Sequence, residues 1–593
     1  MPDRYWITPC RRLIGPAWLV AACAALVLVQ GPLALAQRVP VVERVLDNGM
    51  RLLLVERHDE PTISGGWVAH VGSANERAGI TGIAHLFEHM MFKGTPTLGT
   101  KDYARDLEIM AEQEKTRDEM RGEVDKVRAA FRRGDIDDPF KLENMTPRYR
   151  ELEARFKGLI EEQRKILVKN EFDRVYTSNG GSMMNAFTTV DMTGYFITVP
   201  ANKLELWMWM ESERLLRPVF REFYAERDVV YEERRMRTES TPLGKFAESF
   251  EALFWESHPY GWPTLGTPSD VSAISKADAD AFYGLYYAPQ NISLILVGDL
   301  DPKSAEALVR RYFSRIPRGK NAVPSFIPLV NAQPAEKRML AEADANPQVD
   351  IYWHTVPFQH KDSYPLTVLG QLLSTRTGRL YKKLVMGSQV ATEAEGAQFS
   401  RKWAGVFNIT GEARDGKTPQ QVEEGIYAAV EELKEQEVPA EELQKVKNNF
   451  AAGEYRRLSS NFPILRQLIQ NDGLGDWREI NDAGAKIQAV TAADVRRVAA
   501  RYFTKEARAV GVYTRKAGSA SAADDEYAGL APDQKPIMMK IASQIQGETS
   551  LEKLQQALQA LEQRAGDGDA KRKVLMSLYK KKLQARIAEL QKK

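Results

Sequence analysis

One short segment is the most informative part of this sequence: His85-Leu86-Phe87-Glu88-His89, followed by Met-Met-Phe-Lys-Gly-Thr at residues 90–95. Apolar residues recur at helical spacing from residue 79 to residue 92, which predicts a helix. Residues four apart lie on the same face of a helix, so His85 and His89 are expected to point toward one ion. Glu88 lies on nearly the same side, one residue before the second histidine.

This spacing predicts a zinc site. Zinc suits two imidazoles, and a catalytic zinc usually has three protein ligands and one water. Glu88 can take a proton from that water and pass it to a leaving amine. The chain has only 7 histidines among 593 residues, so the pattern rarely arises by chance. The alternative is structural, with both imidazoles serving only as hydrogen-bonded side chains on a helix face.

The composition limits the classes of protein to which this chain can belong. A chain of 593 residues with 43% hydrophobic and 27% charged residues fits a globular protein of two to four domains. Wholesale disorder and a multi-span membrane protein are excluded by this balance. The 82 basic and 80 acidic residues give a net charge of +2, far from the basic footprint of a nucleic-acid-binding protein. We therefore expect no nucleic-acid partner.

The N-terminal 36 residues have the pattern of a secretory signal peptide. Arg11 and Arg12 precede an apolar run, and residues 34–36 read Ala-Leu-Ala before Gln37. An uncleaved anchor helix is the alternative. Both cysteines, Cys10 and Cys23, lie in this leader, so the mature chain has no thiol and carries 79 basic and 79 acidic residues. We expect an exported, periplasmic or extracellular protein that has no membrane contact after cleavage.

Strand and helix patterns divide the mature chain. Residues 46–50 predict a hairpin turn into a strand at 51–55, and residues 63–71 predict the next strand. In residues 101–170, 34 of 70 residues are charged, mostly at helical spacing with a break at 134–139, which predicts two long solvated helices. This insertion is either a solvated helical hairpin without a chemical role or, packed with the charged C-terminal tail, a lid or docking surface.

An internal repeat indicates two related halves. Residues 274–287 are matched without a gap by residues 490–503, each a capped amphipathic helix with an aromatic pair before an apolar strand. Any capped helix would look similar, which is the alternative. We predict a signal peptide (1–36), an N-terminal metallopeptidase domain (40–316) with its insertion (101–170), a linker (317–345), a C-terminal domain (346–516) and a helical tail (517–593).

The motif order H-x-x-E-H, with residues 90–95, resembles the pitrilysin and insulinase family of inverzincin metallopeptidases. Residues 180–188, Gly-Gly-Ser-Met-Met-Asn-Ala-Phe-Thr, are similar to the family's G-G-x-x-N-A-x-T segment. Residues 226–233, Glu-Arg-Asp-Val-Val-Tyr-Glu-Glu, are similar to its E-R-x-V-V-x-x-E helix. Residues 258–260 and 291–298 match later landmarks, so the resemblance covers about residues 40–100 and 171–515.

The resemblance implies the remaining site residues. It makes His85, His89 and Glu233 the zinc ligands, with Glu88 as general base and Glu226 as the carboxylate that orients a ligand. The residues alone do not identify Glu233 as the third ligand, because neighbouring glutamates lie on the same charged helix. Only the alignment with the family motif selects it. Asn185 and Ala186 are similar to the family's edge strand, on which a peptide substrate adds as an extra strand. Without the family, a plain buried turn is the alternative for this segment.

The chain departs from the family in two places. Between His89 and Glu233 lie 143 residues, about twice the family's usual number, because of the charged insertion. In the later domain, Val385 and Thr392 stand where active members usually carry an Arg and a Tyr that engage the substrate. In some two-chain members one chain carries the metal motif and its partner carries the Arg and Tyr. We therefore expect a homo- or heterodimer with another family member.

Together these features predict an α+β fold with two homologous domains, each a mostly antiparallel sheet packed with helices. To these the charged insertion adds a helical hairpin and the C-terminus a helical tail. In the family such a pair of domains faces a second pair to enclose a chamber. The predicted function is that of a Zn²⁺-dependent endopeptidase acting on unfolded or short peptides. The alternative is a noncatalytic subunit that binds polypeptides or scaffolds an assembly.

Overall fold

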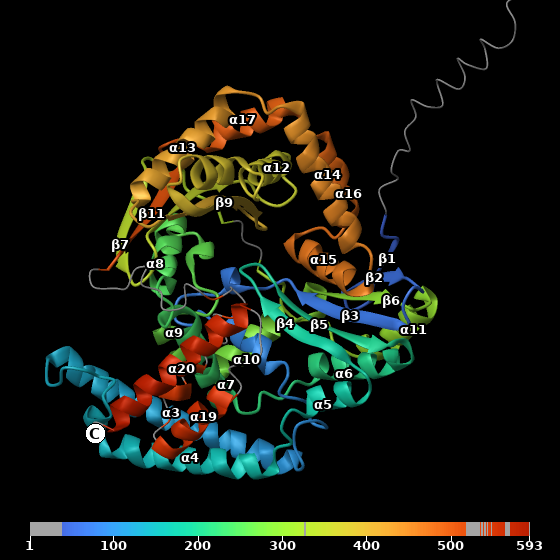
Figure 1. Cartoon of the computed structure of the whole chain (residues 1–593). Helices are drawn as coiled ribbons and strands as arrows, with labels where there is room; N and C mark the ends of the chain where they lie inside the picture. Colours follow the sequence, from blue (N-terminus) through green and yellow to red (C-terminus); the bar gives the residue numbers. More distant parts are fainter. Residues whose placement is uncertain are drawn as a thin grey trace, which may run out of the picture. The chain divides into compact units, whose positions relative to one another are not determined.

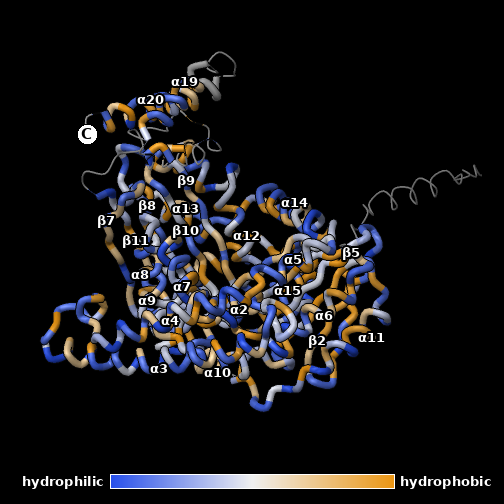
Figure 2. Tube along the Cα trace, turned by 90° about the horizontal axis from the view of Figure 1, so that it is seen from below, coloured by the Kyte–Doolittle hydropathy of each residue, from blue (hydrophilic) through white to orange (hydrophobic). Residues whose placement is uncertain are grey.

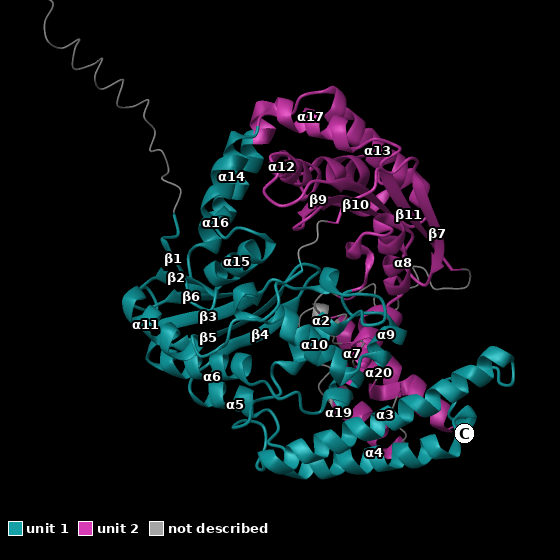
Figure 3. Cartoon of the chain, turned by 180° about the vertical axis from the view of Figure 1, so that it is seen from behind, with its two compact units in different colours: residues 1–228, 264–326, 444–490 teal, residues 229–263, 327–443, 491–593 magenta. Residues whose placement is uncertain are grey.

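The computed structural model of the chain (Figure 1) describes residues 38–324, 328–516, 550–563 and 570–591, with residues 530, 534, 538, 541–542, 544–546 and 548. The predicted signal peptide lies outside the described residues. Two compact units interleave along the sequence, as Figure 3 shows. The first comprises residues 1–228, 264–326 and 444–490, and the second comprises residues 229–263, 327–443 and 491–593.

The first unit contains a six-stranded sheet with the order β1-β2-β6-β3-β5-β4. β2 and β6 are parallel, and the other neighbouring strands are antiparallel. The predicted hairpin is confirmed, since β1 and β2 pair up to Val45 and Arg51 beside the turn. The strands are β1 (Val41–Val45), β2 (Arg51–Glu56), β3 (Thr62–Ala69), β4 (Ser182–Thr188), β5 (Thr193–Pro200) and β6 (Ile292–Gly298).

A helix from far along the sequence, α15 (Asn461–Leu474), packs on this sheet. Its isoleucine and leucine side chains join strands β2, β3 and β6 in one buried cluster. Asp472 is fully buried there, with one oxygen 2.7 Å from Arg51 Nη1 and the other 3.1 Å from His70 Nε2. Burial would raise the pKa of Asp472, but His70 and Arg51 lower it to about 2. These pairs keep α15 in register, because an unpaired buried carboxylate is costly.

The second unit repeats the topology of the first. Its sheet has the order β7-β11-β8-β10-β9, with β7 and β11 parallel and the other neighbours antiparallel. This is the pattern of β2-β6-β3-β5-β4 and confirms the predicted α+β class with two related domains. β7 lies inside the segment predicted as a linker, 317–345. The strands are β7 (Lys337–Ala343), β8 (Gln348–Thr355), β9 (Ala391–Ser400), β10 (Gly405–Ala413) and β11 (Arg508–Arg515).

The predicted repeat has the same local structure in both copies. Ser275 and Asp278 form a reciprocal capping box at the first helix, and Thr491 and Asp494 form one at the second. Each helix precedes the strand that pairs in parallel with a neighbour, β6 in one unit and β11 in the other. The two helices are α10 (Lys276–Tyr286) and α17 (Ala492–Tyr502).

The charged insertion is an antiparallel helical hairpin, as predicted. α3 (Tyr103–Arg133) ends at Gly134, whose φ of 78° stops the helix, and α4 (Pro147–Ile166) returns. Gln113 donates to Gln163 at 3.1 Å, and Thr146 donates to Glu123 at 2.7 Å, which fixes the antiparallel register. In Figure 2 hydrophilic (blue) and hydrophobic (orange) stretches alternate along the far end of the hairpin.

The C-terminal tail also contains a pair of helices, α19 (Leu551–Gln563) and α20 (Ala570–Gln591). Leu554, Leu561, Leu583 and Ile587 form a small buried cluster between them. Among the described residues, no helix combines the length and the apolar character that crossing a bilayer requires.

Candidate metal centre

The helix at the centre of the site, α2 (Ile83–Met90), lies within the range predicted from the sequence. His85 is buried and His89 partly buried, and their ring centroids are 4.9 Å apart. Glu76 accepts hydrogen bonds from the backbone N–H groups of Gly82 and Ala84, each at 2.8 Å. Burial raises the pKa of Glu76 well above its usual range, although both amides lower it. Glu76 thus fixes the N-terminal turn of α2 by satisfying amides that a helix leaves without internal partners.

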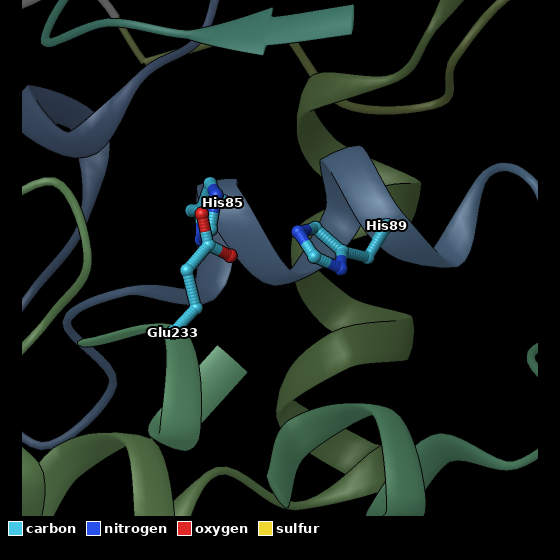
Figure 4. A group of neighbouring side chains, drawn as sticks. All are labelled: His85, His89 and Glu233. Carbon is cyan, nitrogen blue, oxygen red and sulfur yellow. The ribbon is translucent and has the colours of Figure 1, made fainter. Parts of the chain in front are cut away.

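A third side chain joins the two histidines. Glu233 lies on α7 (Phe223–Arg234), and Figure 4 shows its carboxylate beside His85. The ligand atoms of His85, His89 and Glu233 all lie within 4.8 Å of one another. Arg237, four residues further on, also contacts this carboxylate, with 2.9 Å between Nη2 and Oε1. Among the described residues, no other group of three His, Cys, Asp or Glu side chains is close enough to hold a metal ion.

The donor chemistry of this group fits zinc. Two imidazole nitrogens and one carboxylate oxygen are the protein ligands of a common type of catalytic zinc centre, which keeps a fourth position for water or substrate. The three side chains come from two helices, so their spacing depends on how α2 and α7 are anchored. The structure thus brings together all three residues that the family register predicted as ligands.

Glu88 stands next to this group. Its Oε2 lies 4.0 Å from His85 Nε2 and accepts a hydrogen bond of 2.7 Å from the hydroxyl of Thr188. Thr188 is the last residue of β4, so the sheet edge holds the carboxylate of the helix. A carboxylate fixed in this way can exchange a proton with a reacting group beside the metal.

Glu226 contacts His89 and not the other ligands. Its Oε1 lies 2.8 Å from His89 Nδ1, so Nε2 is the nitrogen that would coordinate a metal. Its Oε2 lies 2.5 Å from Lys93 Nζ, which also lies 3.3 Å from Glu222 Oε2. Burial would raise the pKa of Glu226, but the hydrogen bond with His89 and the charge of Lys93 lower it to about 2. The position fits the orienting role that the resemblance implied.

Asn185 and Ala186 lie on β4, the edge strand of the first sheet. Within the described part of the chain β4 pairs with β5 alone, so its other edge can accept an additional strand. The Asn185 side chain accepts a hydrogen bond from the N–H of Ala186 at 2.8 Å. Both residues border a cavity of about 500 Å³ that also reaches Glu88 and His89. The structure therefore places the predicted edge strand beside the predicted metal site.

Two family models match this chain. Residues 51–117 match "Insulinase (Peptidase family M16)", and residues 273–450 match "Peptidase M16 inactive domain". The first range contains His85, Glu88 and His89. Both models describe peptidase family M16, the pitrilysin and insulinase family, to which this chain is similar in these two segments. Glu226 and Glu233 lie between the two matched ranges.

Similar proteins are named as proteases. The zinc protease PqqE of Helicobacter pylori is 26% identical over 486 residues, which are 79% of this chain and 91% of the relative. A crystal structure of a Helicobacter pylori protease covers 80% of this chain and 100% of its own, with a TM-score of 0.65 and 23% identity. The periplasmic protease PqqL of Escherichia coli has a TM-score of 0.58 and 17% identity; the match covers 84% of this chain and 50% of PqqL. These two structures support the fold.

In this chain the positions expected for Arg and Tyr hold neither a cation nor a phenol. Val385 is buried in a π-helical segment, η7 (Tyr381–Gly387). Thr392, in β9, donates its hydroxyl hydrogen bond to Glu412 at 2.7 Å. Neither side chain can supply the charge or the acidic hydroxyl that the family places there.

Sequence reasoning missed three residues that hold the site together: Glu76, Lys93 and Thr188. Lys93 and Thr188 stood inside the quoted motifs, but nothing in the sequence showed which carboxylate each would contact. No pattern in the sequence pointed to Glu76, since an acidic residue seven positions before the start of a helix is common in loops. Their contacts are made only once β4, α2 and α7 are folded.

Replacing Glu226 with glutamine tests its role in orienting His89. We expect zinc affinity to fall by about tenfold or more, because the amide loses the charge that holds Lys93 and weakens the bond to His89 Nδ1. Competition with a chelator of known affinity measures the change. Glu222→Gln is the matched control, because Glu222 contacts Lys93 but not His89. Equal affinities of the two variants would contradict the assigned role.

Proposed function

We propose that this protein is a zinc-dependent endopeptidase that cleaves unfolded or short peptides. The observation that carries the proposal is the group formed by His85, His89 and Glu233, with their ligand atoms within 4.8 Å of one another and Glu88 alongside. The names of the relatives support a zinc protease of family M16.

Each residue has a distinct part in the proposed reaction. Zinc bound by His85, His89 and Glu233 would polarise the scissile carbonyl and lower the pKa of the attacking water. Glu88 accepts the proton of that water on its carboxylate and delivers it to the leaving amine. Thr188 holds Oε2 of Glu88, which fixes the direction in which the carboxylate faces.

The open edge of β4 suits an extended peptide. A substrate that adds as a strand beside Asn185 and Ala186 is held by backbone hydrogen bonds, which are available in any sequence. Only an unfolded or flexible segment can present its backbone in this way. To pair with the edge, the peptide replaces the contact between Asn185 Oδ1 and the Ala186 N–H.

Removal and return of the metal test the proposal. We expect the purified chain to hydrolyse an unstructured peptide when loaded with zinc, to lose this activity with a chelator, and to regain it when zinc is added. Magnesium should not restore activity, because it prefers an all-oxygen octahedral shell. Hydrolysis that persists in the metal-free chain would refute the zinc mechanism.

A partner subunit is part of the proposal. Because Val385 and Thr392 replace the expected Arg and Tyr, full activity would require another family member that carries both. Comparing the zinc-loaded chain alone with the chain plus proteins that co-purify from the source measures this need. Full turnover by the chain alone would remove the partner from the proposal without touching the zinc site.

We place this activity outside the cytoplasm. The first 36 residues have the pattern of a signal peptide, and the relative PqqL of Escherichia coli is a periplasmic protease. Fractionation of cells that express the full chain, with N-terminal sequencing of the mature protein, tests export and the cut after Ala36. A chain that stays in the cytoplasm with its N-terminus intact would contradict export.

A further inference from the structure

An arginine on α15 lies beside the edge strand to which the proposed function assigns the peptide. Arg466 extends from this helix, which covers one face of the first sheet (Figure 1). Its guanidinium carbon lies 4.3 Å from the ring centre of Phe187 on β4 and 4.6 Å from that of Phe196 on β5. The helix and both strands belong to the first unit. The cation is therefore held against the two strands at the open edge of this sheet.

This cation has no carboxylate partner. Within the described part of the chain, no side chain forms an ion pair or a hydrogen bond with the Arg466 guanidinium, and its Nη1 is enclosed. Burial lowers the pKa of this guanidinium. The two aromatic rings attract the cation, but they offer no oxygen to its N–H groups. A partly buried charge without a counter-ion is costly, so a carboxylate that came from outside would stabilise it.

Two other buried arginines of this unit show how the fold usually treats such a charge. Arg214 lies over the rings of Trp67 and Tyr195, as Arg466 lies over its phenylalanines, but it is also paired with Glu211. Arg221 is paired with Asp106. Arg466 has the aromatic contacts without the acid, and it is the one of the three that lies beside the edge strand.

The alternation of side chains along β4 sets this arginine apart from the metal centre. Thr188 points to α2, where its hydroxyl contacts Glu88, and Phe187 points to α15. Residues directly opposite one another on paired strands share a face of the sheet. A peptide residue opposite Phe187 therefore directs its side chain to Arg466. Its neighbour opposite Thr188 lies on the side of the metal-binding helix, so the residue at Arg466 is close to the reacting bond.

We propose that Arg466 binds an acidic side chain of the peptide substrate and so selects peptides with Asp or Glu close to the scissile bond. This inference rests on the proposed peptidase function and names the substrate class for the same site. A guanidinium can donate two parallel hydrogen bonds to a carboxylate, which a neutral amide cannot match in strength. The stacked rings hold the guanidinium in one orientation before the peptide arrives, which lowers the entropy cost of binding.

The test is a set of peptides with amidated C-termini that contain one glutamate. The glutamate is moved through three positions on either side of a fixed cleavage bond, and each peptide is matched by one with glutamine. For the zinc-loaded chain, with any partner it needs, we expect glutamate at one position to raise kcat/KM about tenfold over glutamine. The two adjacent positions should show no such ratio, because their side chains point to the other face of the sheet.

Variants of the arginine test whether this ratio depends on its charge. Arg466→Met keeps an apolar side chain against the rings and should reduce the ratio of the glutamate to the glutamine peptide to about one. Arg466→Glu should favour lysine over glutamate at the same position. The matched control is Arg456→Met, which removes an exposed arginine from α14 (Ala440–Arg457) and should keep the wild-type ratio. Melting temperatures show whether each variant is folded.

Peptide binding separates the possible failures. The zinc-loaded Glu88→Gln chain, which lacks the proposed base, should bind the fluorescently labelled glutamate peptide about tenfold more tightly than the glutamine peptide. Equal cleavage and binding of the two peptides, or a ratio that persists in Arg466→Met, would overturn the inference while leaving the peptidase function standing. So would a preference that requires a free C-terminal carboxylate. If the wild-type chain cleaves no peptide with zinc and partner present, the proposed function itself fails.

Discussion

Glu88→Gln is expected to lower peptide hydrolysis by about a hundredfold to ten-thousandfold while leaving zinc bound. The amide keeps the size of the carboxylate and can still accept the Thr188 hydrogen bond, but it cannot take up a proton. Because Glu88 is not one of the three ligands, metal content should stay at the wild-type value. Hydrolysis rates at saturating zinc, together with metal content of the same preparation, measure both effects.

An exposed glutamate provides the control for this variant. Glu108, on the solvent side of α3, pairs with Arg105, and Glu108→Gln should leave hydrolysis unchanged. This pair of variants also distinguishes the enzyme from a noncatalytic binding subunit. A Glu88→Gln protein that cleaves peptides as fast as the wild type would remove Glu88 from the mechanism.

Glu233→Gln is expected to cause the second large loss, that of zinc itself. The neutral amide is a poor ligand for zinc, and its loss leaves only two imidazoles, fewer than the three protein ligands that a catalytic zinc usually has. We expect no stoichiometric zinc after dialysis and no hydrolysis at micromolar zinc. The wild-type melting temperature should rise on zinc addition, because a ligand that binds only the folded state stabilises it, and the variant should show no rise.

The neighbouring glutamate is the matched control for Glu233. Glu232 is exposed and pairs with Arg235, so Glu232→Gln should bind zinc like the wild type. Without the family motif, the sequence does not show whether Glu232 or Glu233 is the third zinc ligand. If Glu232→Gln lost the metal and Glu233→Gln kept it, the register carried over from the family would be wrong by one residue.

Apolar residues at helical spacing predict the helix, and the four-residue spacing of the histidines then puts both imidazoles on one face with Glu88 nearby. Glu233 needed the family, since a carboxylate in a charged helix carries no local signal. Thr188 and Lys93 could not be assigned partners, because their contacts join segments that are about 100 residues or more apart. The local sequence pattern therefore identifies the histidines and the base, whereas the side chains that hydrogen-bond to them are determined by contacts between distant segments.

The same limit applies to the fold. The strand hairpin, the helical insertion and the internal repeat could be predicted from local periodicity and helix capping, and the structure contains all three. The sequence did not indicate that α15 joins the core of the first sheet, since an amphipathic helix can cover any apolar face. Nor did the segment predicted as a linker, 317–345, reveal that β7 of the second sheet lies within it.

Zinc titration of the metal-free chain, followed by peptide hydrolysis and metal content in the same samples, tests the assignment of the site most directly. For the wild type we expect activity to rise in proportion to bound zinc and to stop at one ion per chain. His85→Ala should show neither binding nor activity. Full hydrolysis by the metal-free wild-type chain, or one zinc retained by His85→Ala, would contradict a catalytic zinc centre at His85, His89 and Glu233.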